Sequence, residues 1–194
     1  MSHYYYFAAT LPTLQPGGEA PMTSAEFLER AARYLGEREF TALSAARLSS
    51  PEGGESAECL GVSPLLDGYY AWERAFRAAL AKLRAGRLGR PAPALPVAES
   101  SITLDVEAQA RAAFQAASPL EGELAFERAR WSAIESYLGY DSFSFEAVAA
   151  YRLRLQSLER TASLTAERGE EGYRAAYAAI LGAANTIDLS GDPR

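Results

Sequence analysis

The chain has 194 residues, of which 48% are hydrophobic and 23% charged, a balance typical of a globular protein and not of a disordered one. Its formal net charge of −6 argues against nucleic-acid binding, because phosphate backbones require a basic surface. No apolar run reaches the roughly 20 residues of a membrane-spanning helix. The N-terminus lacks the basic region and cleavage site of a signal peptide, so we expect a cytoplasmic protein without direct membrane insertion.

Few residues are available for nucleophilic or metal-dependent chemistry. Cys59 and His3 are the only cysteine and histidine, which excludes an intrachain disulfide and a thiolate metal cluster, and a catalytic triad would have to use His3. The sequence has no phosphate-binding loop, dinucleotide-binding glycine pattern or HExxH motif. We therefore expect no catalytic residues, no cofactor and no metal. One enzymatic alternative is a carboxylate pair of the glycosidase type, drawn from Glu121, Glu123, Glu127 and Glu135.

The N-terminal part predicts short helices separated by loops. The opening HYYYFAATL fits either a short strand or a first helical turn, and prolines and glycines then predict a loop. Thr23 and Glu26 form a capping box that begins a helix, which we expect to end at Gly36. A second helical segment covers 37–48. The stretch 49–61, SSPEGGESAECLG, predicts a flexible loop.

A long amphipathic helix is predicted over 64–84, with Ser63 as N-cap and Pro64 as its first residue. Its apolar stripe consists of Leu65, Tyr69, Trp72, Phe76, Leu80 and Leu83. The proline-rich stretch 85–96 predicts a linker between an N-terminal lobe, 1–90, and a C-terminal lobe, 97–194; a single compact domain is the alternative. Arg87 and Arg90, with Arg84 directly before the stretch, make it basic. It is either a solvated linker or a surface for an anionic contact.

The C-terminal part predicts four further helices. One begins at Thr103 or Asp105 and ends near 117; the next begins with Ser118-Pro119-Leu120-Glu121, the strongest start signal in the chain, and ends at Gly139. The third, capped by Ser142 or Ser144, reaches about 167 with a heptad-like stripe, and the last covers 173–184. The expected fold is all-α: a bundle of about six to eight helices, with at most one short N-terminal strand.

Two of these helices form a hairpin around an aromatic turn. We expect Trp131 and Ile134 to pack against Tyr151 and Leu155 in the core. The aromatic residues of both halves are likewise expected to be core and not interface: Trp72, Trp131, Phe143, Phe145 and Tyr151.

Four arginines of this hairpin are the candidate partner-contact residues: Arg128, Arg130, Arg152 and Arg154. In one interpretation they pair within their own helices, and Glu127, three residues before Arg130, is well spaced for that. In the other they form a charged docking edge for an acidic partner helix.

Three blocks of the sequence carry a family resemblance: YYYFAATLPTL, SPLEGELAFERARW and FSFEAVAAYRLRLQSLER. They resemble uncharacterised bacterial proteins encoded within operons of V-type (A/V-type) ATPases. A more distant similarity, through Phe145–Tyr151 followed by Glu159-Arg160, points to the C-type subunit of V/A-type ATPases, called d in eukaryotes. That protein is a helical socket that couples the central shaft to the membrane ring. Typical members of the C-type family have three helical lobes, whereas this chain accommodates about two.

The resemblance implies a non-catalytic coupling or stalk subunit. Its partners would be other V/A-type ATPase subunits, the central shaft and the membrane ring, and it would be peripheral to the inner membrane through them. The alternative is a free-standing helical adaptor or regulator that binds a soluble protein partner.

Overall fold

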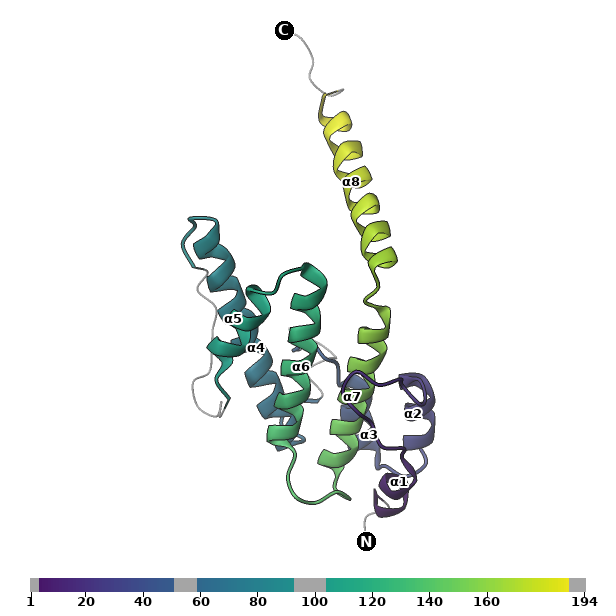
Figure 1. Cartoon of the computed structure of the whole chain (residues 1–194). Coiled ribbons are helices and arrows are strands. Elements are labelled where there is room, and N and C mark those ends of the chain that lie inside the picture. The colour runs from purple at the N-terminus through teal and green to yellow at the C-terminus, as the bar shows by residue number, and fades with distance from the viewer. Residues whose placement is uncertain (1–3, 51–58, 93–103, 189–194) are drawn as a thin grey trace. The chain divides into compact units, whose positions relative to one another are not determined.

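A computed structural model describes residues 4–50, 59–92 and 104–188, and this part of the chain forms eight α-helices and no strand (Figure 1). The predicted all-α class is confirmed, and the N-terminal tyrosines belong to a helix. His3, most of the predicted 49–61 loop and residues 93–103 lie outside the described residues. The helices are α1 (Tyr4–Thr10), α2 (Ser24–Ala31), α3 (Glu37–Ala45), α4 (Pro64–Arg87), α5 (Val106–Phe114), α6 (Pro119–Tyr137), α7 (Phe145–Ser163) and α8 (Ala166–Asp188).

The chain divides into two units, Met1–Thr161 and Ala162–Arg194. The sequence instead predicted a boundary at 85–96. The helices on either side of that stretch, α4 and α5, pack on each other within the first unit, and both contact α6. Proline marks where helices stop, but it does not reveal which apolar faces meet afterwards.

Aromatic side chains of α4 and α6 form the centre of the first unit. The rings of Phe76 and Phe126 stack in parallel, with centroids 4.4 Å apart, and Trp72 packs on Phe76 at 5.2 Å. The indole N–H of Trp72 donates to Gln109 at 3.0 Å, which satisfies a buried donor and attaches α5. The apolar stripe predicted on the long helix is therefore the core face of α4.

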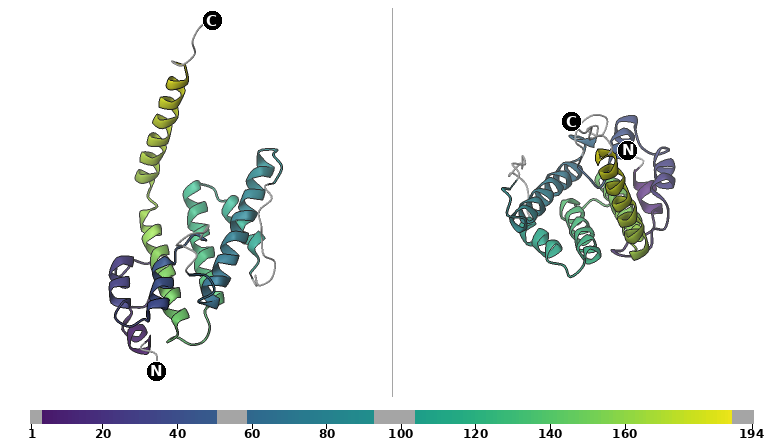
Figure 2. Two further views of the ribbon diagram at one scale, coloured as in Figure 1. Left: turned by 180° about the vertical axis from the view of Figure 1, so that it is seen from behind. Right: turned by 90° about the horizontal axis from the view of Figure 1, so that it is seen from above.

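The N-terminal helices pack on α7. Phe27 of α2 stacks on Tyr151 of α7 at 5.3 Å, and Phe7 of α1 lies 5.6 Å from Phe27. At the start of α2, the backbone N–H and the hydroxyl of Ser24 donate to the Glu159 carboxylate at 2.6 and 2.5 Å. Figures 1 and 2 show α1 to α3 beside α7, with α6 and then α4 following across the unit.

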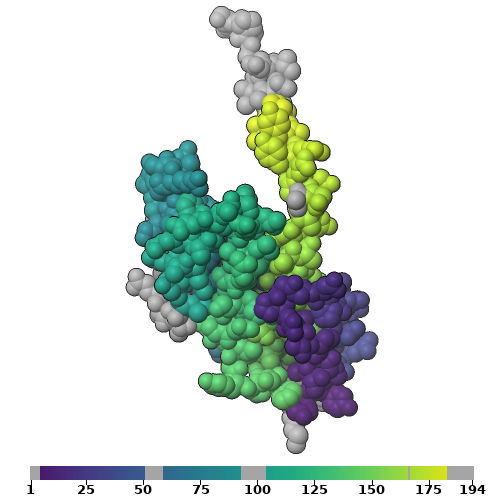
Figure 3. Space-filling view, in the orientation of Figure 1, coloured from purple at the N-terminus to yellow at the C-terminus, as the bar shows by residue number. Residues whose placement is uncertain are grey.

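The loop before α2 lies against α6 and α7. In Figure 3 the N-terminal segment, in purple, covers part of the green surface of these helices. Pro16 and Gly17 of this loop line a small cavity of about 200 Å³ together with Arg128, Trp131 and Leu158.

The predicted core residues are mostly buried. Trp72, Trp131, Ile134, Phe145 and Leu155 are all at least nine-tenths buried. The face of Trp131 is covered by the Arg154 guanidinium, 5.3 Å from the ring centroid. Two of the aromatic residues predicted to be core are less buried. Tyr151 is partly buried and packs on α2, whereas Phe143 in the turn is 39% exposed.

Several predicted helix starts are confirmed. The capping box of Thr23 and Glu26 is present, and the Ser118 hydroxyl accepts from the backbone N–H of Glu121 at 3.2 Å. Pro64 is the first residue of α4, but the Ser63 hydroxyl makes no capping bond. Gly36 was predicted as the end of α2. That prediction is wrong, because α2 ends at Ala31 and Gly36 precedes α3 as its N-cap.

The predicted long helix through residue 167 is interrupted. α7 ends at Ser163 and α8 begins at Ala166, because the Thr165 hydroxyl accepts from the N–H of Arg168 at 3.3 Å and starts a new helix. Gly169 lies inside α8. Side chains 167–182 of α8 are all exposed.

α4 runs one turn further than predicted, to Arg87. Gly89 has φ +62°, and its N–H and that of Arg90 donate to the carbonyls of Gly86 and Ala85. These two bonds are the ones that close a helix with a glycine in the left-handed conformation. Arg84 and Arg87, predicted in or beside a linker, are thus on the last turns of a packed helix. Among the described residues, no helix combines the length and apolar character that spanning a membrane would require.

Candidate functional site

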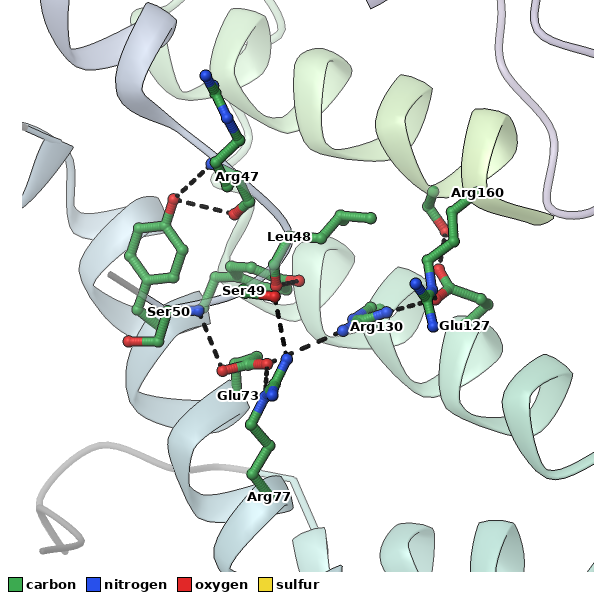
Figure 4. A network of polar contacts seen from close by, with 12 residues as sticks. Arg47, Leu48, Ser49, Ser50, Glu73, Arg77, Glu127, Arg130 and Arg160 are labelled. Atoms are coloured by element: carbon green, nitrogen blue, oxygen red, sulfur yellow. Dashed lines mark hydrogen bonds and ion pairs between the residues drawn. The ribbon is translucent and has the colours of Figure 1, made fainter. Parts of the chain in front are cut away.

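A chain of buried charges connects α4, α6 and α7. In Figure 4, Glu73, Arg130, Glu127 and Arg160 alternate in sign across the three helices. The side chains of Glu73, Glu127 and Arg130 are each at most 5% exposed. Burying an ion without partners costs several kcal/mol, so every member of such a chain requires an opposite charge or a hydrogen bond.

Glu73 is the first carboxylate of this network. It accepts from the backbone N–H of Ser50 at 3.1 Å and pairs with Arg77, one turn further along α4. The Arg130 guanidinium lies 3.9 Å from the same carboxylate. Tyr69 and Tyr70 hold the segment before Ser50 in place, since their hydroxyls donate to backbone carbonyls of that segment at 2.8 and 3.1 Å. A loop, α4 and α6 therefore converge on one buried carboxylate.

Glu127 is the second carboxylate. It pairs with Arg130 on its own helix and accepts from Ser157 at 2.6 Å and from Arg160 at 2.9 Å, both on α7. Arg160 also donates to Glu123 at 2.7 Å. Partial burial opposes the charged form of Arg160, but the bonds and charges of these two glutamates outweigh it and raise its pKa. The network therefore ties α6 to α7 through charged and hydrogen-bonding groups.

Arg130 lies between the two carboxylates. Its guanidinium is 3.9 Å from the centroid of the Phe126 ring, a cation–π geometry. Its Nε is buried and has no hydrogen-bond partner in the described part of the chain.

A cleft of about 740 Å³ opens beside the network. One wall is a face of α4. It consists of Arg77, Leu80, Arg84 and Arg87, each about one helical turn after the previous one. The opposite wall comes from α6 and α7, and the turn between α5 and α6 closes one end. That wall and that end are lined by Ala113, Phe114, Ala116, Ala117, Ser118, Pro119, Gly122, Glu123, Phe126, Arg130 and Arg160.

Gly122 allows the closed end of the cleft to form. A Cβ on this residue would lie 3.0 Å from the Ala113 carbonyl oxygen, closer than ordinary contact. Only glycine lets the end of α5 approach α6 this closely. The start of α6 is already capped by Ser118 and by Glu121, whose carboxylate accepts from the N–H of Ala117 at 3.0 Å.

The cleft is locally positive in a chain of net charge −6. Five arginines line it, and the three carboxylates that pair with them are Glu73, Glu123 and Glu127, which leaves two positive charges. These two belong to Arg84 and Arg87, which form no ion pair with any described residue. Arg87 lies over the Phe114 ring, 5.7 Å from its centroid. Both arginines are exposed.

The structure does not bring the four predicted contact arginines onto one exposed edge. Only Arg128 is exposed. Arg130 is 2% and Arg152 3% exposed, so both are occupied by the protein's own groups. Arg154 is half-buried and pairs with Glu135 at 3.5 Å. The intrahelical pairing of Glu127 with Arg130 is confirmed.

Arg152 supports the backbone after α3. Its guanidinium donates to the carbonyls of Ala46 and Ser44 at 3.3 and 3.4 Å. Burial, assisted by the nearby Arg47, lowers the pKa of Arg152 to about 10. The residue remains charged at neutral pH, and its contacts are with its own chain.

Two of the four glutamates of the enzymatic alternative, Glu123 and Glu127, lie at one arginine, and the other two have separate partners. Glu123 and Glu127 share Arg160, and Glu121 accepts a backbone N–H. Glu135 is exposed and accepts from the Trp131 indole at 2.9 Å.

Sequence reasoning missed Glu73 and Arg77. The available signal was position: Glu73 lies four residues after Tyr69, on the apolar stripe of α4, and Arg77 follows at the spacing of a helical ion pair. A carboxylate on a buried stripe with such a partner indicates a buried network.

Comparison with known proteins adds no relative. No protein-family model, curated protein or solved structure matches the chain.

Proposed function

We propose that this protein is a non-catalytic coupling or stalk subunit associated with a bacterial V/A-type ATPase, linking rotor shaft and membrane ring. The three sequence blocks that resemble proteins of V-type ATPase operons support the proposal, and the all-α fold agrees with what that resemblance implies. In this role the protein is cytoplasmic and reaches the inner membrane only through its partner subunits. Its work is mechanical, and no residue makes or breaks a bond.

The observation that carries the proposal is the exposed apolar face of α8. Tyr173, Tyr177, Ile180 and Leu181 are 70%, 54%, 66% and 47% exposed. Their spacing of four, three and one places them on one side of the helix. The two tyrosine rings already stack, with centroids 6.2 Å apart. Contiguous exposed apolar residues are typical of protein contact sites.

Affinity purification of the full chain from its native cells at low salt tests this proposal. We expect the central-shaft and membrane-ring subunits to be recovered with it. The double variant Tyr177→Asp/Ile180→Asp places two charges on the apolar face and is expected to reduce that recovery at least about tenfold, since buried charges oppose association.

The matched control is Ala175→Asp/Ala179→Asp, which adds the same two charges on the opposite side of α8 and is expected to leave recovery unchanged. Recovery of a single partner that is not an ATPase subunit would favour the alternative, a free-standing adaptor or regulator. If no ATPase subunit is recovered with the wild-type chain, the proposal is wrong.

A further inference from the structure

We infer that the cleft between α4 and α6 binds a small molecule that carries two or more phosphate groups. This inference rests on the first unit alone and does not depend on the proposed function. The lining residues all lie before Thr161, so the site is complete within one unit.

The arrangement of charges determines the class of ligand. The ion pairs described above occupy Arg77, Arg130 and Arg160, whereas Arg84 and Arg87 have no acidic partner among the described residues. The two uncompensated positive charges therefore suit a ligand with at least two negative charges. Guanidinium groups bind phosphate oxygens through paired hydrogen bonds, so phosphate is the anion that this lining recognises best.

The dimensions of the cleft favour a ligand larger than one phosphate. From Arg77 to Arg87 the helix rises about 15 Å, at 1.5 Å per residue. The volume of about 740 Å³ is within the range of pockets that hold small organic ligands. A chain of phosphates can lie along α4 and contact Arg84 and Arg87 together.

Arg130 on the inner wall of the cleft is 2% exposed, and its charge is already paired with Glu127. The start of α6 does not supply the site, because Ser118 and Glu121 already cap it and the Glu121 carboxylate would repel an anion there. The anion therefore belongs beside the arginines of α4.

Calorimetric titration of the full chain with inorganic tripolyphosphate, at low salt, tests the inference. We expect binding of one tripolyphosphate per chain and an increase in melting temperature on binding. Monophosphate is expected to bind at least about tenfold more weakly, because it contacts fewer guanidinium groups. The variant Arg84→Gln/Arg87→Gln is expected to weaken tripolyphosphate binding by at least about tenfold, since it removes two charged hydrogen bonds.

The matched control is Arg33→Gln/Arg38→Gln, which removes two exposed arginines that lie outside the cleft and leaves the net charge of the two variants equal. Unchanged affinity in this control supports a defined site. Equal weakening in both variants would show attraction to overall charge only and would overturn the inference.

A titration with a nucleoside triphosphate distinguishes the source of the phosphates. If a nucleoside triphosphate binds more tightly than tripolyphosphate, the ligand is a phosphate ester that also contacts the aromatic wall at Phe114; equal affinity assigns binding to the phosphates alone. Both results support the inference. Absence of tripolyphosphate binding at millimolar concentration, or binding of an acidic peptide in its place, overturns it.

Discussion

Glu127 is the residue on which the contact between α6 and α7 depends most. Its carboxylate is bonded to Arg130, Ser157 and Arg160, and it is 5% exposed. Its neighbour Glu123, one turn earlier, pairs with one described residue, Arg160, and is 41% exposed in its side chain. The same charge at these two positions should therefore have different effects on stability.

Glu127→Ala should lower the free energy of unfolding by about 3–5 kcal/mol, because it leaves the buried Arg130 guanidinium with only the more distant Glu73. Glu123→Ala, the control, should cost no more than about 1 kcal/mol, as expected of an exposed pair. Urea unfolding followed by circular dichroism measures both. Equal losses would contradict the assignment of a buried network.

Cys59 gives a pH-dependent prediction. Burial raises the pKa of its thiol above the ordinary value of 9.0, although a hydrogen bond with Tyr70 opposes this. The unfolded chain therefore releases the thiol proton at lower pH than the folded one. The stabilising effect of the neutral thiol is fully present below pH 9 and is lost as the pH rises through the folded-state pKa.

The difference in unfolding free energy between wild type and Cys59→Ala should therefore decrease as the pH rises above about 9, and should stay constant between about pH 7 and 8. Urea unfolding at each pH provides the values. A difference that stays flat across the whole range would show that the thiol titrates alike in both states.

At the scale of the elements, two glycines of α4 differ in how packing affects their replacement by alanine, the better helix former. A Cβ on Gly68 would lie 2.5 to 2.9 Å from three atoms of the Tyr137 ring, including Cγ near its base. The ring cannot move aside without changing its rotamer. Gly86, on the same helix, has nothing within 4 Å of that position. Gly68 therefore positions α6 against α4, whereas Gly86 has no packing role.

Gly68→Ala should destabilise the protein by about 1–3 kcal/mol, because the added methyl group overpacks the contact with Tyr137. Gly86→Ala should stabilise it by up to about 1 kcal/mol, because alanine is the better helix former. Thermal unfolding of the two variants measures the difference in sign. If both variants stabilise the protein, the ring of Tyr137 does not pack on α4 in solution.

At the scale of the whole molecule, the first unit contains the core and the cleft, and the described side chains of α8, 167–182, are all exposed. A chain ending after Ser163 should therefore retain the fold of the first unit, with a melting temperature within about 2 °C of the full chain. It should also still bind tripolyphosphate, while losing the recovery of ATPase subunits. Unfolding of the shortened chain would show that α8 stabilises the first unit.

The sequence by itself determined the helical class, most helix starts and the apolar stripe of α4. These features depend on local chemistry: Thr23 with Glu26, Pro64, and Ser118 with Pro119 act through backbone groups a few residues away. The ends of helices were less predictable. Gly36 was predicted to end α2 but instead precedes α3 as its N-cap. Thr165 begins a new helix where the apolar periodicity alone predicts that α7 continues.

Only the tertiary structure decided which charges are buried and which are free. Arg130 and Arg152 are buried and Arg154 is half-buried, whereas Arg128 of the same hairpin is exposed. Glu73 and Glu127, on different helices, meet at Arg130 because α4 packs on α6. The pairing of charges across helices depends on which apolar faces meet. For this reason the cleft lined by Arg84 and Arg87 could not be predicted from the sequence and became visible only in the tertiary structure.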